Sequence, residues 1–136
     1  PGDPRDIPEI IEMTRKFIEE KKTVIGICLG HQIVALSLGG EVSKMKFGHR
    51  GSNHPVKDID RNKIFISSQN HGYVVTKVPS ILRESHINLN DNTNEGMKSI
   101  NTDEYKIMTV QFHPEASPGP EETAYIFDEF LSLIRK

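Results

Sequence analysis

The one cysteine of this 136-residue chain, Cys28, lies between two glycines, Gly26 and Gly30, in the segment Gly-Ile-Cys-Leu-Gly. A short apolar run, 23–25, precedes this segment, and an apolar stretch of helical length, 33–38, follows it. This order predicts a sharp turn between the end of a buried strand and the start of a helix. Such a turn strains the backbone of its central residue and crowds the neighbouring residues, so we expect a glycine on each side of the cysteine.

The position of Cys28 favours a chemical role over a purely structural one. A cysteine at the start of a helix lies at the positive end of the helix dipole, which favours the thiolate, the nucleophilic form. A lone cysteine is more often an inert part of the core, but the two flanking glycines favour the nucleophile. We therefore predict that Cys28 is a nucleophile.

The composition predicts a single domain that binds neither nucleic acid nor membranes. A chain of 136 residues with 35% hydrophobic residues can bury one core, so we expect one domain over 1–136. The net charge of −2 provides no basic surface for nucleic acid or for an anionic membrane. The single cysteine excludes an internal disulfide, and no apolar run has the length of a membrane span or a signal peptide. We expect a cytoplasmic location, where thiols stay reduced.

Apolar residues at helical spacing predict a helix near each end of the chain. The segment Asp6-Ile7-Pro8-Glu9 resembles a capping box and opens an amphipathic pattern, which predicts a helix over 6–22 that packs on a sheet. The segment Ser117-Pro118-Gly119-Pro120 predicts a turn, and we expect a last helix from Glu121 to the end of the chain.

The strand pattern predicts an α/β fold. The run 23–28 is typical of a parallel strand buried on both faces, and Gly39-Gly40 ends the helix that follows Cys28. Six short β-prone segments then follow one another: 42–47, 63–67, 73–78, 83–90, 96–100 and 106–112. Because no helical pattern separates these segments, we expect a mainly parallel sheet flanked by helices, with a β-rich antiparallel insertion.

A cysteine nucleophile needs a base to take its proton, and the six histidines are the candidates. His113 follows the most apolar of the late strands, where a parallel sheet would bring it to the same edge as Cys28. Glu115 could accept a hydrogen bond from the imidazole and fix its tautomer. The sequence therefore predicts a triad of Cys28, His113 and Glu115, although His-Pro-Glu alone is also typical of a loop with a surface charge pair.

The other five histidines are weaker candidates. His71, at a predicted turn after a strand, is the best of them for lining a substrate pocket. We expect His49 and His54 to hold a loop by hydrogen bonds, His86 to be exposed, and His31 to be a residue of the helix's first turn.

Known motifs for metals and nucleotides are missing from the sequence. It has no Cys-x-x-Cys pair, no His-Glu-x-x-His segment and no cluster with zinc spacing, so we predict no metal site. Its glycines form neither a P-loop nor a dinucleotide fingerprint, so we predict no cofactor.

The segments Gly26-Ile27-Cys28-Leu29-Gly30-His31-Gln32 and His113-Pro114-Glu115 together resemble the signature of the class I, triad-type glutamine amidotransferases. The opening Pro1-Gly2-Asp3-Pro4 resembles the end of that family's Gly-Pro-Gly-Asp-Pro turn. Three longer blocks, 44–56, 69–73 and 113–120, resemble the amidotransferase domain of the carbamoyl phosphate synthetase small subunit. The resemblance covers the whole chain and implies the flavodoxin-like fold of this family.

The resemblance implies hydrolysis of L-glutamine through a γ-glutamyl thioester on Cys28. His113 would carry the proton to the departing ammonia, and Glu115 would orient His113. The ammonia would pass to the large subunit of carbamoyl phosphate synthetase, for arginine or pyrimidine synthesis.

Six further residues are predicted by motif match to hold the substrate: Gly2, Leu29, Gln32, Asn70, Gly72 and Tyr73. The Leu29 backbone N–H also fits one oxyanion donor, because it follows the nucleophile at the helix start. Without the resemblance, Gln32 would be a solvated side chain of the first helical turn, Tyr73 an ordinary strand residue, and Gly72 a requirement of the turn.

The resemblance also implies that something precedes this chain. The family's domain begins with further strands and helices that end in Ser-Asn-Gly-Pro-Gly, so we expect the N-terminal part of the domain to be missing and the 136 residues alone to have little glutaminase activity. Two alternatives stay open. One is another cysteine hydrolase of the same fold, such as a γ-glutamyl peptidase, and the other is a non-catalytic interaction subunit.

Overall fold

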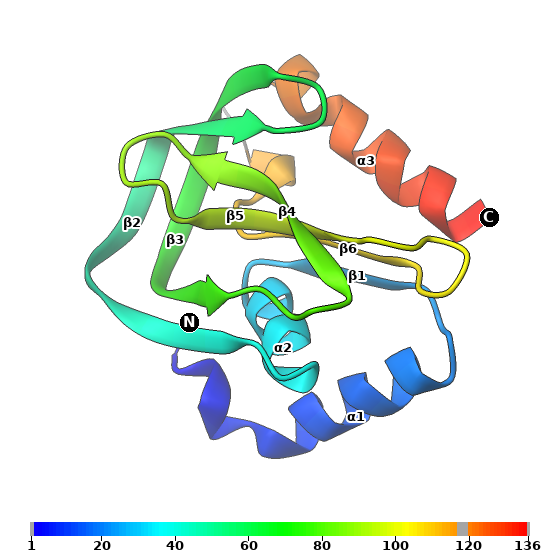
Figure 1. The fold of residues 1–136 in the computed structure, drawn as a ribbon. Helices are drawn as coiled ribbons and strands as arrows, with labels where there is room; N and C mark the ends of the chain where they lie inside the picture. The colour runs from blue at the N-terminus through cyan, green and yellow to red at the C-terminus, as the bar shows by residue number, and fades with distance from the viewer. Residues whose placement is uncertain (1, 117–119, 136) are drawn as a thin grey trace.

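A computed structural model describes residues 2–116 and 120–135, which form a six-stranded sheet with helices on both faces (Figure 1). The strand order is β1-β6-β5-β4-β2-β3. The strands are β1 Val24–Ile27, β2 Glu41–Asp58, β3 Lys63–Lys77, β4 Leu82–Asn88, β5 Asn94–Ser99 and β6 Ile107–Val110. The helices are α1 Pro8–Glu19, α2 Leu29–Ser37 and α3 Pro120–Arg135, with short 3₁₀ turns at Pro4–Asp6 and Pro114–Ala116.

The sheet is mixed, which confirms the predicted α/β class with an antiparallel insertion. β1 and β6 pair in parallel, with Ile27 opposite Val110, and the other pairs among the described strands are antiparallel. The parallel part is therefore smaller than expected, because β2 to β6 follow one another without a helix and short connections join antiparallel neighbours. β1 lies at one edge of the sheet, and three of its four residues are only half-buried, whereas burial on both faces was predicted.

Two apolar clusters, one on each face, hold the helices to the sheet. Successive residues of β6 point to opposite faces, so Ile107 joins the cluster that contains Val34 of α2, and Met108 joins the cluster that contains Phe130 of α3. α1 packs mainly against α2 through Ile18, not directly on the sheet as predicted (Figure 1). Among the described residues, no helix combines the length and the hydrophobicity that crossing a membrane requires.

The predicted capping box at the start of α1 is wrong. α1 begins at Pro8, and Ile7 is its N-cap without a side-chain hydrogen bond. Asp3 caps the preceding 3₁₀ turn instead, since its carboxylate accepts a hydrogen bond from the Arg5 backbone N–H at 2.9 Å. Pro8 at the start of the helix agrees with the pattern, because proline lacks the N–H that a first helical turn cannot use.

β2 and β3 form one long hairpin, where the sequence predicts three short strands separated by turns. Gly48 and Gly51 have φ angles of +73° and +100°, and the pairing register shifts close to both. These glycines therefore form bulges inside a continuous strand instead of ending it. As a consequence, His71 lies within β3 and not at a turn.

The remaining predicted elements are confirmed, with small differences at their ends. β4, β5 and β6 correspond to the segments predicted over 83–90, 96–100 and 106–112. α3 begins at Pro120, one residue before the predicted start. The turn predicted over 117–120 falls largely on 117–119, which lie outside the described residues.

A buried acid joins β2, β4 and α3. Asp58 is fully buried, accepts a hydrogen bond from the Tyr125 hydroxyl at 3.0 Å and lies 3.5 Å from Nε2 of His86. His86 is fully buried as well, so the prediction that it is exposed is wrong. The local sequence could not indicate this, because the acidic partner of His86, Asp58, comes from a distant part of the chain. Burial acts to raise the pKa of Asp58, but His86, the Arg61 N–H and Tyr125 outweigh it and lower the pKa.

We expect Tyr125→Phe to lower the free energy of unfolding by about 1–2 kcal/mol near neutral pH, because the hydroxyl donates to a charged, buried carboxylate. An acid with a lowered folded-state pKa contributes stability above its unfolded pKa and loses that contribution as the pH falls toward its folded pKa. The difference between variant and parent should therefore shrink in acid. Urea unfolding at about pH 7 and about pH 3 measures both values.

Tyr105→Phe is the matched control, because in the described structure its hydroxyl makes no hydrogen bond and its ring keeps the contact with Lys21. Equal losses in the two variants, or no loss in Tyr125→Phe, would contradict the role given to the Asp58 contact.

Candidate active site

Cys28 lies at the strained turn that its neighbours predict. It is the N-cap of α2, directly after β1, and has φ +54° and ψ −107°, a conformation rare for a residue with a side chain. A Cβ atom on Gly26 would lie 2.8 Å from the backbone C and O of Gly30. A Cβ atom on Gly30 would meet nothing within 4 Å. Crowding therefore requires a glycine at 26, whereas the expected requirement at 30 is absent.

The Cys28 thiol is buried and surrounded by polar groups. Its Sγ lies 3.9 Å from the Asn70 carbonyl oxygen, and Gln111 Nε2 donates to it at 3.8 Å. Burial raises the pKa of Cys28 and outweighs the opposite effect of hydrogen bonds from the Leu29 backbone N–H and Gln111. The helix start therefore acts toward the thiolate, as expected, but burial prevails in this state. The thiol is protonated at neutral pH and needs a base.

His113 and Glu115 follow the carboxyl end of β6, next to the carboxyl end of β1, which Cys28 follows. The Cys28 N–H donates to the Val110 carbonyl at 2.9 Å, which aligns the carboxyl ends of the two parallel strands. His113 Nδ1 lies 3.1 Å from Glu115 Oε1, and the Glu115 charge acts on the Cys28 thiol. The structure thus brings the three predicted triad residues to one edge; their roles stay predictions.

Gln32 and Gln111 form a buried pair next to the thiol. Gln32 Nε2 donates to Gln111 Oε1 at 2.9 Å and to the Tyr73 carbonyl oxygen at 3.0 Å. The alternative of a solvated Gln32 is therefore wrong. No motif in the sequence singles out Gln111, although it stands two residues before His113 and directly after an apolar strand.

Three of the predicted substrate-binding residues, Gly2, Gly72 and Tyr73, line one cavity of about 340 Å³. The same cavity is lined by the segment 44–48 and by Arg50. These contribute two lysines and an arginine, whereas the one acidic residue in the lining, Asp3, is paired with Arg5 at 2.8 Å. The excess of positive charge suits an anionic group on a ligand.

The other predicted substrate residues, Leu29, Gln32 and Asn70, are not among the residues that line this cavity. Leu29 and Asn70 contact the Cys28 sulfur through their backbone groups. Cys28 itself does not line the cavity, but Asn70 precedes Gly72, which does, by two positions on β3.

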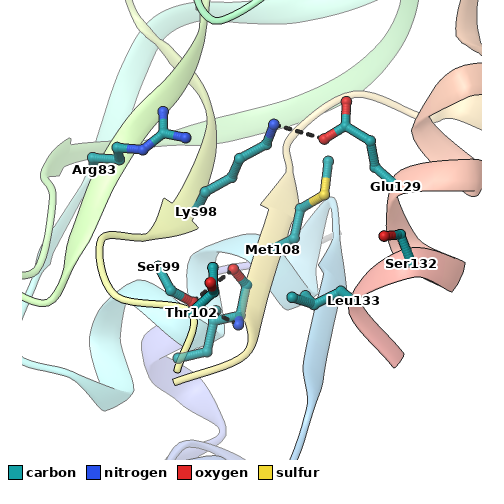
Figure 2. A pocket seen from close by; sticks show the side chains of 9 residues that line it. Arg83, Lys98, Ser99, Thr102, Met108, Glu129, Ser132 and Leu133 are labelled. Carbon is teal, nitrogen blue, oxygen red and sulfur yellow. Dashed lines mark hydrogen bonds and ion pairs between the residues drawn. The ribbon is translucent and has the colours of Figure 1, made fainter. Parts of the chain in front are cut away.

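A second cavity of about 190 Å³ lies between α3 and the strands β4, β5 and β6 (Figure 2). Its charged residues are paired, since Lys98 Nζ lies 2.6 Å from Glu129 Oε2 and Arg83 binds Asp60 through two hydrogen bonds of 2.8 Å. None of the predicted site residues lines this cavity, so it is separate from the Cys28 site.

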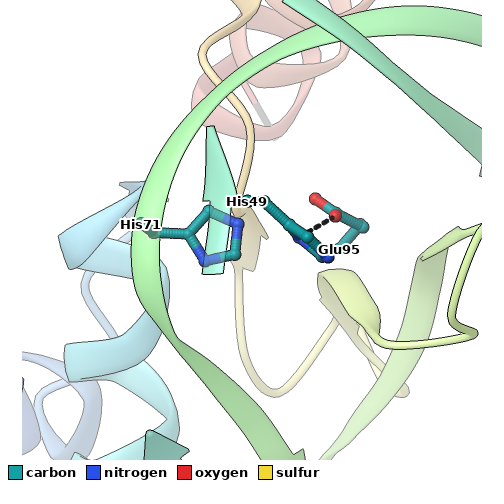
Figure 3. A group of neighbouring side chains, drawn as sticks. All are labelled: His49, His71 and Glu95. Carbon is teal, nitrogen blue, oxygen red and sulfur yellow. Dashed lines mark ion pairs between the residues drawn. The ribbon is translucent and has the colours of Figure 1, made fainter. Parts of the chain in front are cut away.

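The fold gathers a group of possible metal ligands that the sequence did not reveal. Ligand atoms of His49, His71 and Glu95, all buried, lie within 4.8 Å of one another (Figure 3). They come from three strands, so no short motif could have indicated them. The Gln69 side-chain amide contacts His71 Nε2 at 2.8 Å and His49 Nδ1 at 3.1 Å, so these two ring nitrogens already have a hydrogen-bonding partner.

His71 and His49 differ in their electrostatic surroundings. Burial lowers the pKa of His71 to about 4, so its imidazole is neutral, and its Nδ1 donates to the Tyr73 carbonyl at 2.8 Å. Burial also acts to lower the pKa of His49, but the carboxylates of Glu95 and Asp91 outweigh it and raise the pKa. The His71 side chain is buried and is not among the residues that line the charged cavity.

Comparison with known sequences gives this site a family context. A family model described as glutamine amidotransferase class-I matches residues 1–133. Relatives named carbamoyl phosphate synthase small chain are 54% identical over 131 residues in Clostridium perfringens and 55% identical over 139 residues in Bacillus caldolyticus. The matches cover 96% and 100% of this chain but only 36% and 37% of the relatives, so the chain spans little more than a third of their length.

Solved structures with the same fold confirm the predicted architecture. A Thermoplasma acidophilum protein described as a GMP synthase subunit matches with a TM-score of 0.79 and 20% identity, over 97% of this chain and 67% of that one. A glutamine amidotransferase from Thermotoga maritima matches with a TM-score of 0.68 and 20% identity, over 95% of this chain and 55% of that one. At this level of identity the likeness establishes the fold alone.

We expect Gly26→Ala to lower the free energy of unfolding by about 1–3 kcal/mol, because its methyl group would overlap backbone atoms that cannot move aside without shifting the start of α2. Gly30→Ala is the matched control. Its methyl group enters open space on a helix, so its stability should stay within about 1 kcal/mol of the parent or increase. Urea unfolding of both variants checks this, and equal losses would contradict the one-sided contact.

Proposed function

This chain belongs to the class-I glutamine amidotransferase family, and on that premise we propose that the protein carrying it hydrolyses L-glutamine and delivers the ammonia to a carbamoyl phosphate synthetase large subunit. The observation that carries the proposal is the strained Cys28 turn beside the His113–Glu115 pair, at the carboxyl ends of two parallel strands. The location we propose is the cytoplasm, where a single thiol stays reduced.

In the proposed reaction, His113 takes the thiol proton as Cys28 Sγ attacks the side-chain amide carbon of glutamine. The carbonyl oxygen becomes an oxyanion, which the Leu29 backbone N–H stabilises. His113 then returns the proton to the amide nitrogen, ammonia leaves, and a γ-glutamyl thioester remains. A water molecule hydrolyses the thioester, which releases glutamate and restores the thiol.

Two features of the site support the assignment of His113 as the base. Burial keeps the Cys28 thiol protonated at neutral pH, so the nucleophile forms only when a neighbouring group accepts the proton. The contact between His113 Nδ1 and Glu115 places the ring N–H on the carboxylate side, which makes Nε2 the ring nitrogen that can accept that proton.

The cavity lined by Gly2, Gly72 and Tyr73 is the proposed entrance for glutamine. Its positive charge suits the α-carboxylate of an amino acid, because the lysines and Arg50 are not neutralised by an equal number of acids in the lining.

The proposed partner and pathway rest on the relatives. Their printed names describe carbamoyl phosphate synthase small chains, and a Bacillus subtilis relative, 51% identical, is described as pyrimidine-specific. We therefore propose that the ammonia is used to form carbamoyl phosphate, for pyrimidine or arginine synthesis.

The test uses the complete polypeptide that carries this chain, mixed with the large subunit. We expect Cys28→Ala to abolish carbamoyl phosphate synthesis from glutamine, while synthesis from added ammonia continues at the parent rate. We expect His113→Asn to reduce glutamine hydrolysis by about 10²–10⁴-fold, the usual contribution of a general base. A diazo-ketone analogue of glutamine should add its mass to Cys28 in the parent protein.

Each other result would overturn the proposal in a recognisable way. Hydrolysis of γ-glutamyl peptides in preference to free glutamine would indicate a peptidase. An unmodified Cys28 at saturating reagent, without glutamine turnover, would indicate a non-catalytic interaction subunit.

A further inference from the structure

Gln111 occupies the place on β6 that Cys28 occupies on β1. Each residue directly follows its strand, and the parallel register sets Ile27 opposite Val110. Gln111 is fully buried, its backbone N–H donates to the Glu95 carbonyl at 2.9 Å, and its side chain reaches the Cys28 sulfur at 3.8 Å. A polar side chain without solvent contact thus ends on the predicted nucleophile.

The orientation of the Gln111 amide is determined by its neighbours. The Tyr73 backbone carbonyl can only accept hydrogen bonds, so the Gln32 group that faces it at 3.0 Å must be the NH₂. The same NH₂ faces Gln111 at 2.9 Å, so Gln111 presents its oxygen to Gln32. The Gln111 NH₂ is then left to point at Sγ. Reversing the Gln32 amide would place its oxygen against two acceptors, and reversing the Gln111 amide would place two NH₂ groups against each other.

We propose that Gln111 is a catalytic residue that hydrogen-bonds the Cys28 sulfur and favours its ionisation, and that Gln32 is a positioning residue that holds the Gln111 amide in this orientation. The proposal rests on the proposed function, in which Cys28 must lose its proton before it attacks.

The chemistry of the contacts explains why such a donor is useful. In the resting thiol, the S–H points to the Asn70 carbonyl oxygen at 3.9 Å, an acceptor that would repel a thiolate. When the proton leaves, an N–H group on the sulfur stabilises the negative charge, and Gln111 supplies it without bringing a charge of its own into a buried site. The same contact stabilises the sulfur again when it departs from the thioester.

A purely structural role for Gln111 makes a different prediction. Loss of a buried hydrogen-bonded amide would lower stability whatever it touched, but it would not change the ionisation of the sulfur. The experiment must therefore measure how the ionisation of the Cys28 thiol depends on pH, and the measurement must not require glutamine.

The experiment follows the rate of Cys28 alkylation by iodoacetamide against pH in the complete polypeptide without glutamine, by mass spectrometry. We expect Gln111→Met, which keeps the length but has no N–H, to move the midpoint upward by about one pH unit. Gln111→Glu should move it further, because a carboxylate can only repel the thiolate. Gln32→Met should move it in the same direction by a smaller amount, since the Gln111 amide is then free to turn.

Gln69→Met is the matched control. Gln69 is a buried glutamine that binds His49 and His71 but does not touch the sulfur. We expect it to lower stability in urea unfolding and to leave the alkylation midpoint unchanged.

In glutamine hydrolysis, Gln111→Met should reduce kcat by about 10-fold, with a smaller change in KM. This factor corresponds to the expected shift of about one pH unit in the midpoint of thiol ionisation.

An alkylation midpoint that stays at the parent value in folded Gln111→Met would overturn the proposal. If that variant does not fold, Gln111→Glu and Gln32→Met test the proposal in its place. An alkylation midpoint at the parent value in both of these variants would overturn the proposal equally. Because alkylation needs no glutamine, a protein that shows the shift but does not hydrolyse glutamine would refute the proposed function and leave the role of Gln111 intact.

Discussion

The parallel pairing of β1 with β6 is the constraint on which the site depends. Four residues of each strand pair in register, and the Cys28 N–H adds one more bond to the Val110 carbonyl. This short pairing brings together sulfur and amide groups that are 83 residues apart in the chain. Because both strands run in the same direction, Cys28, Gln111 and His113 all follow the carboxyl ends of the two strands on the same side of the sheet. An antiparallel partner for β1 would have sent them to opposite ends.

Local patterns explain why so much of the fold could be predicted. The strand, the strained turn and α2 are encoded within a few residues of Cys28. The turn alone explains why position 26 must be a glycine, because a side chain there would overlap the Gly30 backbone. Gly48 and Gly51 misled the prediction of β2, because a glycine with positive φ serves a bulge as well as a turn. The burial of His86 and the hydrogen bonds of Gln111 depend on distant residues, Asp58 and Gln32, that no local pattern pairs with them.

The ionisation of the thiol shows most clearly what requires the three-dimensional structure. From the sequence, a helix start predicts a thiolate, and the donors on the sulfur act in that direction. Burial acts in the opposite direction and prevails, so the pKa of Cys28 rises. The extent of burial depends on β3, which passes over the sulfur at Asn70 and belongs to a different part of the chain. A protonated Cys28 thiol is protected from chance oxidation, since the thiolate is the reactive form.

The long β2–β3 hairpin also limits how the chain can change during evolution. Side chains alternate between the two faces of a strand, so adding or removing one residue within β3 would turn the whole following segment over. His71, which faces inward, would then exchange places with a neighbour such as exposed Asn70, and the buried histidine and glutamine contacts would be lost. Differences in length should therefore collect at the turn between Asp58 and Lys63, where a longer loop leaves the register untouched.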